Sequence, residues 1–95
     1  MEKVSELACF FSAIRDDHRI GTAHISLYMA IFQEYNLNAF ANPLPITRSS
    51  LMATAKISGL ATYHKCMKEL AAYGYIEYLP SFNPAVRSRV IILKV

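Results

Sequence analysis

Hydrophobic residues recur along residues 2–14 at steps of three and four positions. The stripe consists of Val4, Leu7, Phe11 and Ile14. This spacing is the period of an α-helix that has one apolar face. The charged and polar residues 16–21 interrupt the pattern, so we expect a loop to follow this helix.

A second helical pattern runs from about Ala23 to Asn36, with Thr22 as its expected N-cap. Its broad apolar face comprises Ile25, Tyr28, Ile31, Phe32 and Tyr35. Asparagine and proline residues over 36–45 end the helix. Residues 44–47 suit a small edge strand, where a proline is tolerated.

The second half of the chain predicts two more helices and a β-hairpin. Thr47 can cap a short helix over residues 48–55, and Ser58 can cap another from about Gly59 to Tyr73. Gly74 stands where a left-handed C-terminal residue belongs. Residues 75–79 and 89–95 are rich in β-branched and aromatic residues and predict two strands, with turn chemistry over 80–84.

The helix predicted over residues 59–73 has two distinct faces. Tyr63, Met67 and Leu70 share the inward face, with Cys66 at its edge. The outward positions are Ala61, Thr62, Lys65 and Lys68. The expected fold class is therefore mainly α with a small β-hairpin, which is an α+β fold.

Composition and charge add three constraints. Apolar residues make up 54% of the 95-residue chain, enough for one sizeable core and one domain. No apolar run approaches the roughly 20 residues of a membrane span, and no basic head precedes a long apolar stretch, so we expect a soluble protein without a signal peptide. Cys9 and Cys66 lie far apart and predict reduced thiols and a cytoplasmic location.

The charges are unevenly divided between the two halves of the chain. Residues 1–47 carry three basic and five acidic groups, a net −2, whereas residues 48–95 carry seven basic and two acidic groups, a net +5. A basic half joined to a mildly acidic half favours one face that meets a polyanion.

Several short stretches of the second half form a recognisable series. They are Ile46-Thr47-Arg48, Leu51-Met52, Ser58, Thr62-Tyr63-His64-Lys65, Leu70, Gly74-Tyr75-Ile76, residues 80–84 and Ser88-Arg89-Val90. In this series the chain resembles winged helix-turn-helix DNA-binding domains, especially those of bacterial and phage replication-initiation, replisome-organiser and transcriptional regulator proteins. The resemblance covers about half the chain, with residues 23–35 similar to the first helix of such a domain and residues 2–14 outside it.

The resemblance implies a single winged-helix domain over residues 1–95, with an N-terminal helix and loop over residues 1–20 and the winged-helix core over residues 21–95. It further implies sequence-specific binding to duplex DNA, in transcription regulation or replication initiation of a bacterium or mobile element. The recognition helix, about 59–73, would enter the major groove, and the wing, about 80–89, would meet the backbone or minor groove. The implied DNA-binding residues are Thr47, Arg48, Ser49, Ser58, Ala61, Thr62, His64, Lys65, Lys68, Arg87 and Arg89.

Individual roles follow from residue type. Lys65 suits a guanine or a phosphate, and Ser58 and Thr62 suit a phosphate near a helix N-terminus. Arg87 and Arg89 flank the wing tip, where basic side chains meet the backbone or the minor groove. Arg48 and Ser49, at the start of the preceding helix, suit phosphate positioning.

Two alternatives stay open at this level. The same fold can serve as a protein–protein interaction module in a replication or conjugation assembly, and an apolar patch around Leu60 and Ala61 would favour that function. The helix over residues 2–14 either forms a homodimer, which would double the DNA contacts, or covers the core of its own chain.

Enzymatic function is not indicated. The sequence has no glycine-rich phosphate loop, no Ser-His-Asp order and no paired carboxylates at a pocket-like spacing. His18 beside Asp16 and Asp17 is typical of a charged loop rather than a metal site, and His24 is expected to pack near the start of its helix. We expect no cofactor, no metal, no membrane partner and no small-molecule ligand.

Overall fold

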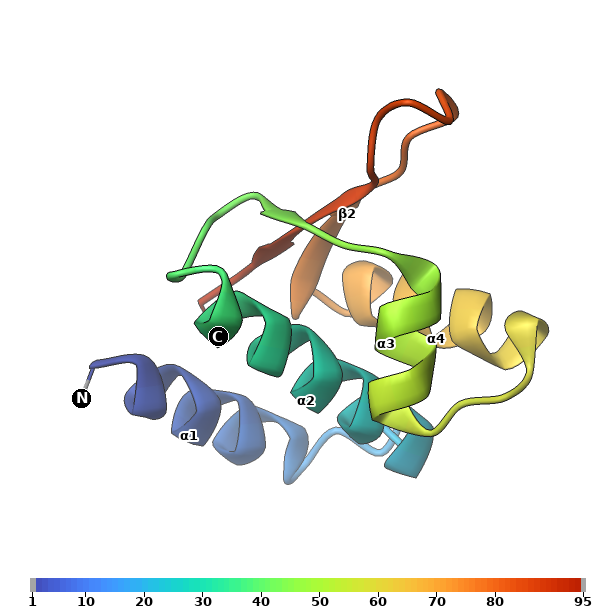
Figure 1. Cartoon of the computed structure of the whole chain (residues 1–95). Helices are drawn as coiled ribbons and strands as arrows, with labels where there is room; N and C mark the ends of the chain where they lie inside the picture. Colours follow the sequence, from blue (N-terminus) through green and yellow to red (C-terminus); the bar gives the residue numbers. More distant parts are fainter. Residues whose placement is uncertain (1, 95) are drawn as a thin grey trace.

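The computed structural model describes residues 2–94 of the chain, with side chains from residue 6 onward. The elements are α1 (Glu2–Ile14), α2 (Thr22–Leu37), β1 (Leu44–Pro45), α3 (Arg48–Ala55), α4 (Leu60–Ala72), β2 (Ile76–Leu79) and β3 (Arg89–Ile92) (Figure 1). This order confirms the predicted α+β class, with four helices and one small sheet. Within residues 2–94, no helix is long and apolar enough to cross a lipid bilayer.

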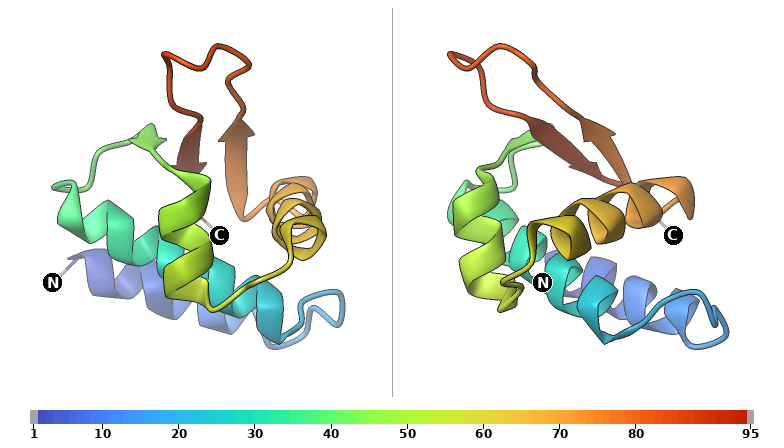
Figure 2. Two further views of the ribbon diagram at one scale, coloured as in Figure 1. Left: turned by 45° about the vertical axis from the view of Figure 1, so that its right-hand side comes forward. Right: turned by 90° about the vertical axis from the view of Figure 1, so that its right-hand side faces the viewer.

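The sheet has three antiparallel strands in the order β1-β3-β2. The register sets Ile76 opposite Ile92 and Tyr78 opposite Val90, which places these four residues on the face that packs on the helices. β1 pairs with β3 through Leu44 and Val90, so it forms an edge strand as expected. The β2–β3 loop extends away from the body of the molecule (Figures 1 and 2).

The core lies between the helices and the inner face of the sheet. α2 supplies the completely buried Leu27 and Ile31, and α4 supplies Met67 and Leu70. In both views of Figure 2, α1 and α2 run side by side on the face opposite the hairpin. The apolar face predicted for the second helix is confirmed for four of its five members, whereas Ile25 is only half-buried.

The stripe predicted on α1 is wrong in one position. Phe11 is 43% exposed, and Phe10 is completely buried instead. The Phe10 ring stacks on Tyr28, with the ring centroids 3.6 Å apart, and Leu7 packs against the same core. Both phenylalanines fit a helical period, and the stacking partner on α2 decides between them. The side chain of Val4 lies outside the described residues.

Two predicted helix starts move by one residue. Gly21 rather than Thr22 is the N-cap of α2, because its N–H donates a 2.9 Å hydrogen bond to Nδ1 of His24. Gly59 rather than Ser58 is the N-cap of α4, and the Thr47 side chain makes no capping hydrogen bond at α3. Gly74 has φ +88°, which confirms the predicted left-handed residue after α4.

Candidate nucleic-acid interface

The outward face of α4 is the first component of the site. Tyr63, Cys66, Met67 and Leu70 are buried, which confirms the predicted inward face and places Cys66 inside the core rather than at its edge. On the opposite side of the helix the four predicted outward residues Ala61, Thr62, Lys65 and Lys68 are all exposed. Ala61, Lys65 and Lys68 recur at steps of four and three, so they share the centre of this face.

One flank of α4 faces the hairpin across a hollow of about 250 Å³. Arg48 from the start of α3 and His64 from α4 line this hollow together with the hairpin residues Tyr78, Phe82 and Ser88. The structure therefore brings together three segments on which the sequence predicted DNA contacts: the first turn of α3, the helix α4 and the β2–β3 loop.

Tyr63 also lines this hollow, although the sequence pattern assigns it only to the core. The residue is 2% exposed, and within residues 2–94 no hydrogen bond forms at its hydroxyl. Burial, followed by the nearby Tyr78, raises the pKa of Tyr63 to about 12, and the cation of Arg48 opposes the shift. The Tyr63 hydroxyl is therefore a neutral hydrogen-bond donor beside a cation. Tyr78, Ser81 and Ser88 are likewise missed by the sequence, since only the folded hairpin places them here.

The other flank of α4 faces the first turn of α2 across a second hollow, of about 380 Å³. Ser58, Gly59 and Thr62 line one side of it, and Lys56 lies at the end of α3. The nearby Ser26 hydroxyl is already engaged, because it donates a hydrogen bond to the carbonyl of Ala55. Ser58 and Thr62 therefore lie together at the N-terminus of α4, apart from the hollow that contains Arg48 and His64.

The first turn of α3 presents its polar residues unequally. Arg48 and Ser49 are exposed, whereas Thr47 is half-buried. The neighbouring Ser50 hydroxyl donates a 2.9 Å hydrogen bond to the Glu34 carboxylate on α2. Arg48 and Ser49 are thus accessible to a ligand, and the nearest acidic side chain of α2 is directed to Ser50.

The two hairpin arginines do not join Arg48 and His64. Arg89 is opposite Leu79 in the register, on the outer face of the sheet, while its neighbour Val90 is buried on the inner face. Arg87 and Arg89 line a separate hollow of about 460 Å³ on the loop. The sequence predicts that both arginines flank the wing tip, and the register adds that Arg89 lies on the outer face of the sheet, away from the helices.

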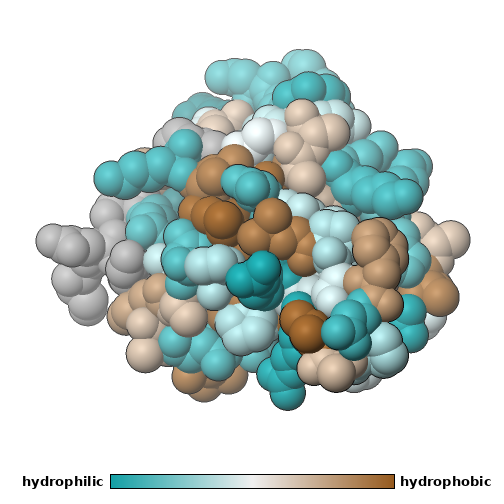
Figure 3. Space-filling view, turned by 90° about the horizontal axis from the view of Figure 1, so that it is seen from above, coloured by the Kyte–Doolittle hydropathy of each residue, from teal (hydrophilic) through white to brown (hydrophobic). Residues whose placement is uncertain are grey.

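Figure 3 views the molecule from the side of the hairpin. A hydrophobic cluster lies near the middle of this face, and hydrophilic side chains surround it. The outer face of the sheet carries the half-buried Leu79 and Ile91, and the exposed Glu77 is directly opposite Ile91 in the register. This face therefore combines apolar and charged groups, in contrast to the polar centre of α4.

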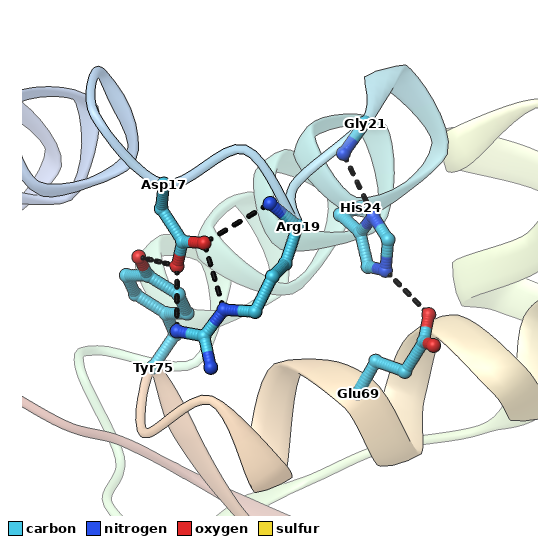
Figure 4. Close-up of polar contacts among 6 residues, drawn as sticks. All are labelled: Asp17, Arg19, Gly21, His24, Glu69 and Tyr75. Carbon is cyan, nitrogen blue, oxygen red and sulfur yellow. Dashed lines mark hydrogen bonds and ion pairs between the residues drawn. The ribbon is translucent and has the colours of Figure 1, made fainter.

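A cluster of paired polar groups lies at the opposite end of α4 (Figure 4). Asp17 accepts hydrogen bonds from Nε and Nη2 of Arg19, at 2.8 and 2.9 Å, and from the Tyr75 hydroxyl at 2.7 Å. These bonds hold the pKa of Asp17 well below its usual value. The guanidinium of Arg19 also lies over the Tyr73 ring, 4.1 Å from its centroid. The cluster ties the α1–α2 loop to the end of α4 and the start of β2.

His24 makes a second tie in the same region. Its Nδ1 accepts the Gly21 N–H, and its Nε2 lies 2.8 Å from Oε1 of Glu69 on α4 (Figure 4). The hydrogen bond from His24 lowers the pKa of Glu69. His24 therefore packs at the start of its helix as predicted, and it fixes α2 to α4.

The histidine of the α1–α2 loop forms no comparable contact. His18 and Asp16 are exposed. Over the described part of the chain, no three His, Cys, Asp or Glu side chains are grouped so that they could hold a metal ion.

The cations of the candidate interface are unpaired. Among the side chains that the structure describes, Arg19 pairs with Asp17 and His24 with Glu69, and no ion pair involves α3, the outward face of α4 or the hairpin loop. Arg48, Lys65, Lys68 and Arg87 are therefore solvated positive charges that a polyanion can neutralise.

Comparison of the chain with protein-family models, with curated proteins and with solved structures returned no match.

Proposed function

We propose that the chain is a winged helix-turn-helix domain that binds duplex DNA. The order α2, β1, α3, α4, β2, loop, β3 supports this assignment, with α3 and α4 as the helix-turn-helix and the hairpin as the wing. In this proposal α1 is an addition that precedes the winged-helix core. The biological setting that the proposal implies is transcription regulation or replication initiation in a bacterium or a mobile element.

The outward face of α4 is the observation that carries the proposal. It is exposed, it carries Lys65 and Lys68 at its centre, and neither lysine forms an ion pair with the described residues. An α-helix with its side chains is about 10–12 Å across, and the major groove is about 12 Å wide, so the groove accommodates α4. The small side chain of Ala61 permits close approach to base edges.

The remaining residues then contact the DNA backbone. Arg48 and Ser49 begin α3 beside the hollow that separates α4 from the hairpin, and Ser58 and Thr62 lie at the N-terminus of α4. Hydroxyls and cations at such positions bond phosphate oxygens, which fixes the register of the helix on the duplex. His64, half-buried beside Arg48, extends the contact toward the wing.

The test is a fluorescence-anisotropy titration of the native chain with random duplex DNA at about 50 and 200 mM salt. The variant Lys65→Ala/Arg87→Ala removes one cation from α4 and one from the hairpin. Its matched control is Arg15→Ala/Lys94→Ala, which removes two exposed cations that lie outside the proposed interface.

We expect the native chain to bind more weakly at the higher salt concentration. The first variant should bind roughly tenfold more weakly at low salt, with a salt slope smaller by about 2, while the control stays near the native value. Absence of binding at low salt, or equal losses in both variants, would exclude this interface.

A protein–protein interaction module in a replication or conjugation assembly is the second candidate. Its specific support is the exposed apolar surface near the same site: Leu60 is 46% exposed and Val86 is 52% exposed. Large exposed hydrophobic groups are typical of protein contacts. Failure of the DNA titration would direct the search to such a partner.

The inner and outer sides of the N-terminal helix have different consequences for dimerisation. Its inner side covers the core of its own chain through Phe10. Phe11, on one flank of the helix, is 43% exposed and leaves an apolar group for a second copy. We propose homodimerisation through this outer side, and sedimentation equilibrium of the native chain and Phe11→Glu tests it. A monomeric native chain would contradict it.

A further inference from the structure

Phe82 is the most exposed large hydrophobic residue of the described chain, with 93% of its surface accessible. It lies in the β2–β3 loop, which projects from the body of the molecule (Figures 1 and 2). A phenylalanine in this setting contributes almost nothing to the core, so folding does not account for its presence there.

The loop around Phe82 is held in one shape by its own hydrogen bonds. The Asn83 side chain accepts the N–H of Ala85 at 3.0 Å, and the Asn83 carbonyl accepts the N–H of Val86 at 2.9 Å. The N–H of Ser81 donates to the hydroxyl of Ser88 at 3.1 Å, which closes the base of the loop. Two prolines, Pro80 and Pro84, restrict the backbone further. Phe82 is therefore presented in a preorganised position, which lowers the entropic cost of a contact.

The charges near Phe82 favour a polyanionic partner. Residues 78–93 contain Arg87 and Arg89 and no acidic residue. Arg87 and Phe82 line the same hollow on the loop. An aromatic ring beside an unpaired arginine suits a nucleic acid, where the ring meets bases and the cation meets phosphates.

The hairpin also has a suitable reach. Six residue steps separate Ile76, the first residue of β2, from Phe82, and at about 3.3 Å per step they span at most roughly 20 Å. Half a turn of B-DNA, which separates a major groove from the adjacent minor groove, is about 17 Å. With α4 in a major groove, the loop can therefore arrive at the neighbouring minor groove.

We propose that Phe82 is an apolar wedge that enters the minor groove and partly unstacks one base step, while Arg87 contacts the adjacent backbone. The DNA is consequently kinked at that step, as apolar wedges do in minor-groove binding proteins. This inference rests on the proposed DNA-binding function and adds a second mode of recognition, namely preference for deformable steps.

The experiment uses a duplex that carries the fluorescent base 2-aminopurine at TA and CA steps, because its emission rises when it is unstacked. The full chain is compared with Phe82→Ala, with Phe82→Leu, which keeps an apolar wedge, and with Leu37→Ala. Leu37 is 69% exposed at the end of α2, so Leu37→Ala is a matched control for loss of an exposed apolar side chain. Circular dichroism verifies that all four proteins are folded.

We expect the native chain and Leu37→Ala to raise the emission equally at saturation. Phe82→Ala should bind roughly tenfold more weakly, since stacking of one base contributes about that factor, and should leave the emission unchanged even when saturated. Phe82→Leu should retain part of the rise.

Saturable binding by Phe82→Ala with the full emission rise would overturn the wedge and leave the proposed function intact. The same holds if the native chain binds without any rise. A native chain that does not bind duplex at low salt would overturn the proposed function itself, and the wedge with it.

Discussion

Charged side chains on two parts of α4 differ in whether they are paired with other groups of the chain. Near its C-terminus, Glu69 is hydrogen-bonded to His24, and the neighbouring Asp17 is bonded to Arg19 and Tyr75. On its outward face, Lys65 and Lys68 are exposed and form no ion pair with described residues. In the proposed function, these exposed lysines are the groups that contact DNA.

The paired charged groups also help to position the outward face of α4. The contact of His24 with Glu69 fixes α2 to α4, and the Asp17 cluster fixes the α1–α2 loop to the start of β2. These ties set the orientation of α4 and the hairpin relative to the rest of the chain. Preorganisation of this kind reduces the ordering cost of binding.

Replacement of Phe10 by alanine should give the largest effect. This effect should be confined to the part of the molecule that contains the paired charged groups. Phe10 is completely buried and stacks on Tyr28, so its loss leaves a cavity between α1 and α2. We expect the free energy of unfolding, measured by urea denaturation, to fall by about 3–5 kcal/mol. Phe11→Ala, on the exposed side of α1, is the control and should cost much less.

Gly74→Ala should have the next largest effect, because Gly74 connects α4 to the hairpin. Its φ of +88° is unfavourable for any residue with a Cβ, although no atom lies within 4 Å of the added methyl group. We expect a loss of about 1–2 kcal/mol in urea denaturation. Gly59→Ala, at a negative φ, should cost less, about 0.5–1 kcal/mol, because alanine is a poorer N-cap than glycine. Equal losses would show that backbone strain is not the cause.

Lys68→Ala tests the unpaired side with a smaller expected effect. Loss of one phosphate contact should weaken duplex binding about threefold and reduce the salt slope by about 1. Stability in urea should not change, because Lys68 is exposed and unpaired. A loss of stability without a loss of DNA binding would show that Lys68 supports the fold and does not contact DNA.

Asp17→Asn should show the smallest effect, and the difference from the native chain should be present at neutral pH and disappear in acid. The folded chain holds the pKa of Asp17 below its ordinary value of 3.8, first through the hydrogen bond from Arg19 and then through that from Tyr75. On acidification the unfolded chain therefore takes up this proton first. The stability that Asp17 contributes is complete above about pH 5 and is lost as the pH falls below about 4.

The urea midpoint of the native chain should consequently fall between about pH 6 and pH 3, and that of Asp17→Asn should fall less. Part of the decline remains in the variant, because the pKa of Glu69 is lowered as well. An identical decline in both proteins would mean that the Asp17 contacts do not form in solution.

The sequence predicts the elements well because their apolar periods are long enough to be unambiguous. The inward face of α4 and the hairpin are both of this kind. The helix starts at Gly21 and Gly59 are missed, since at Gly21 the choice depends on a hydrogen bond to the side chain of His24. The choice of Phe10 over Phe11 depends on a partner 18 residues further along the chain, at Tyr28.

The candidate site is predicted only in part, for a different reason. Exposure of Lys65 and Lys68 follows from the helical period alone. The position of Arg89 on the outer face of the sheet could be predicted, because side chains alternate between the two faces of a strand and the next residue, Val90, is apolar. The Tyr63 hydroxyl at the hollow beside Arg48 was not available, because it depends on where the hairpin folds over α4.

We propose that the outward face of α4, the start of α3 and the hairpin loop form one DNA-binding face. Titration of the 15N-labelled chain with a random duplex, followed by amide chemical-shift changes in two-dimensional NMR spectra, tests it directly. The account predicts shifts concentrated at residues 48–50, 58–68 and 81–89, with little change over α1 and the Asp17 cluster. Shifts centred on the exposed side of α1 and α2, around Phe11 and Leu37, with α4 unaffected, would contradict it.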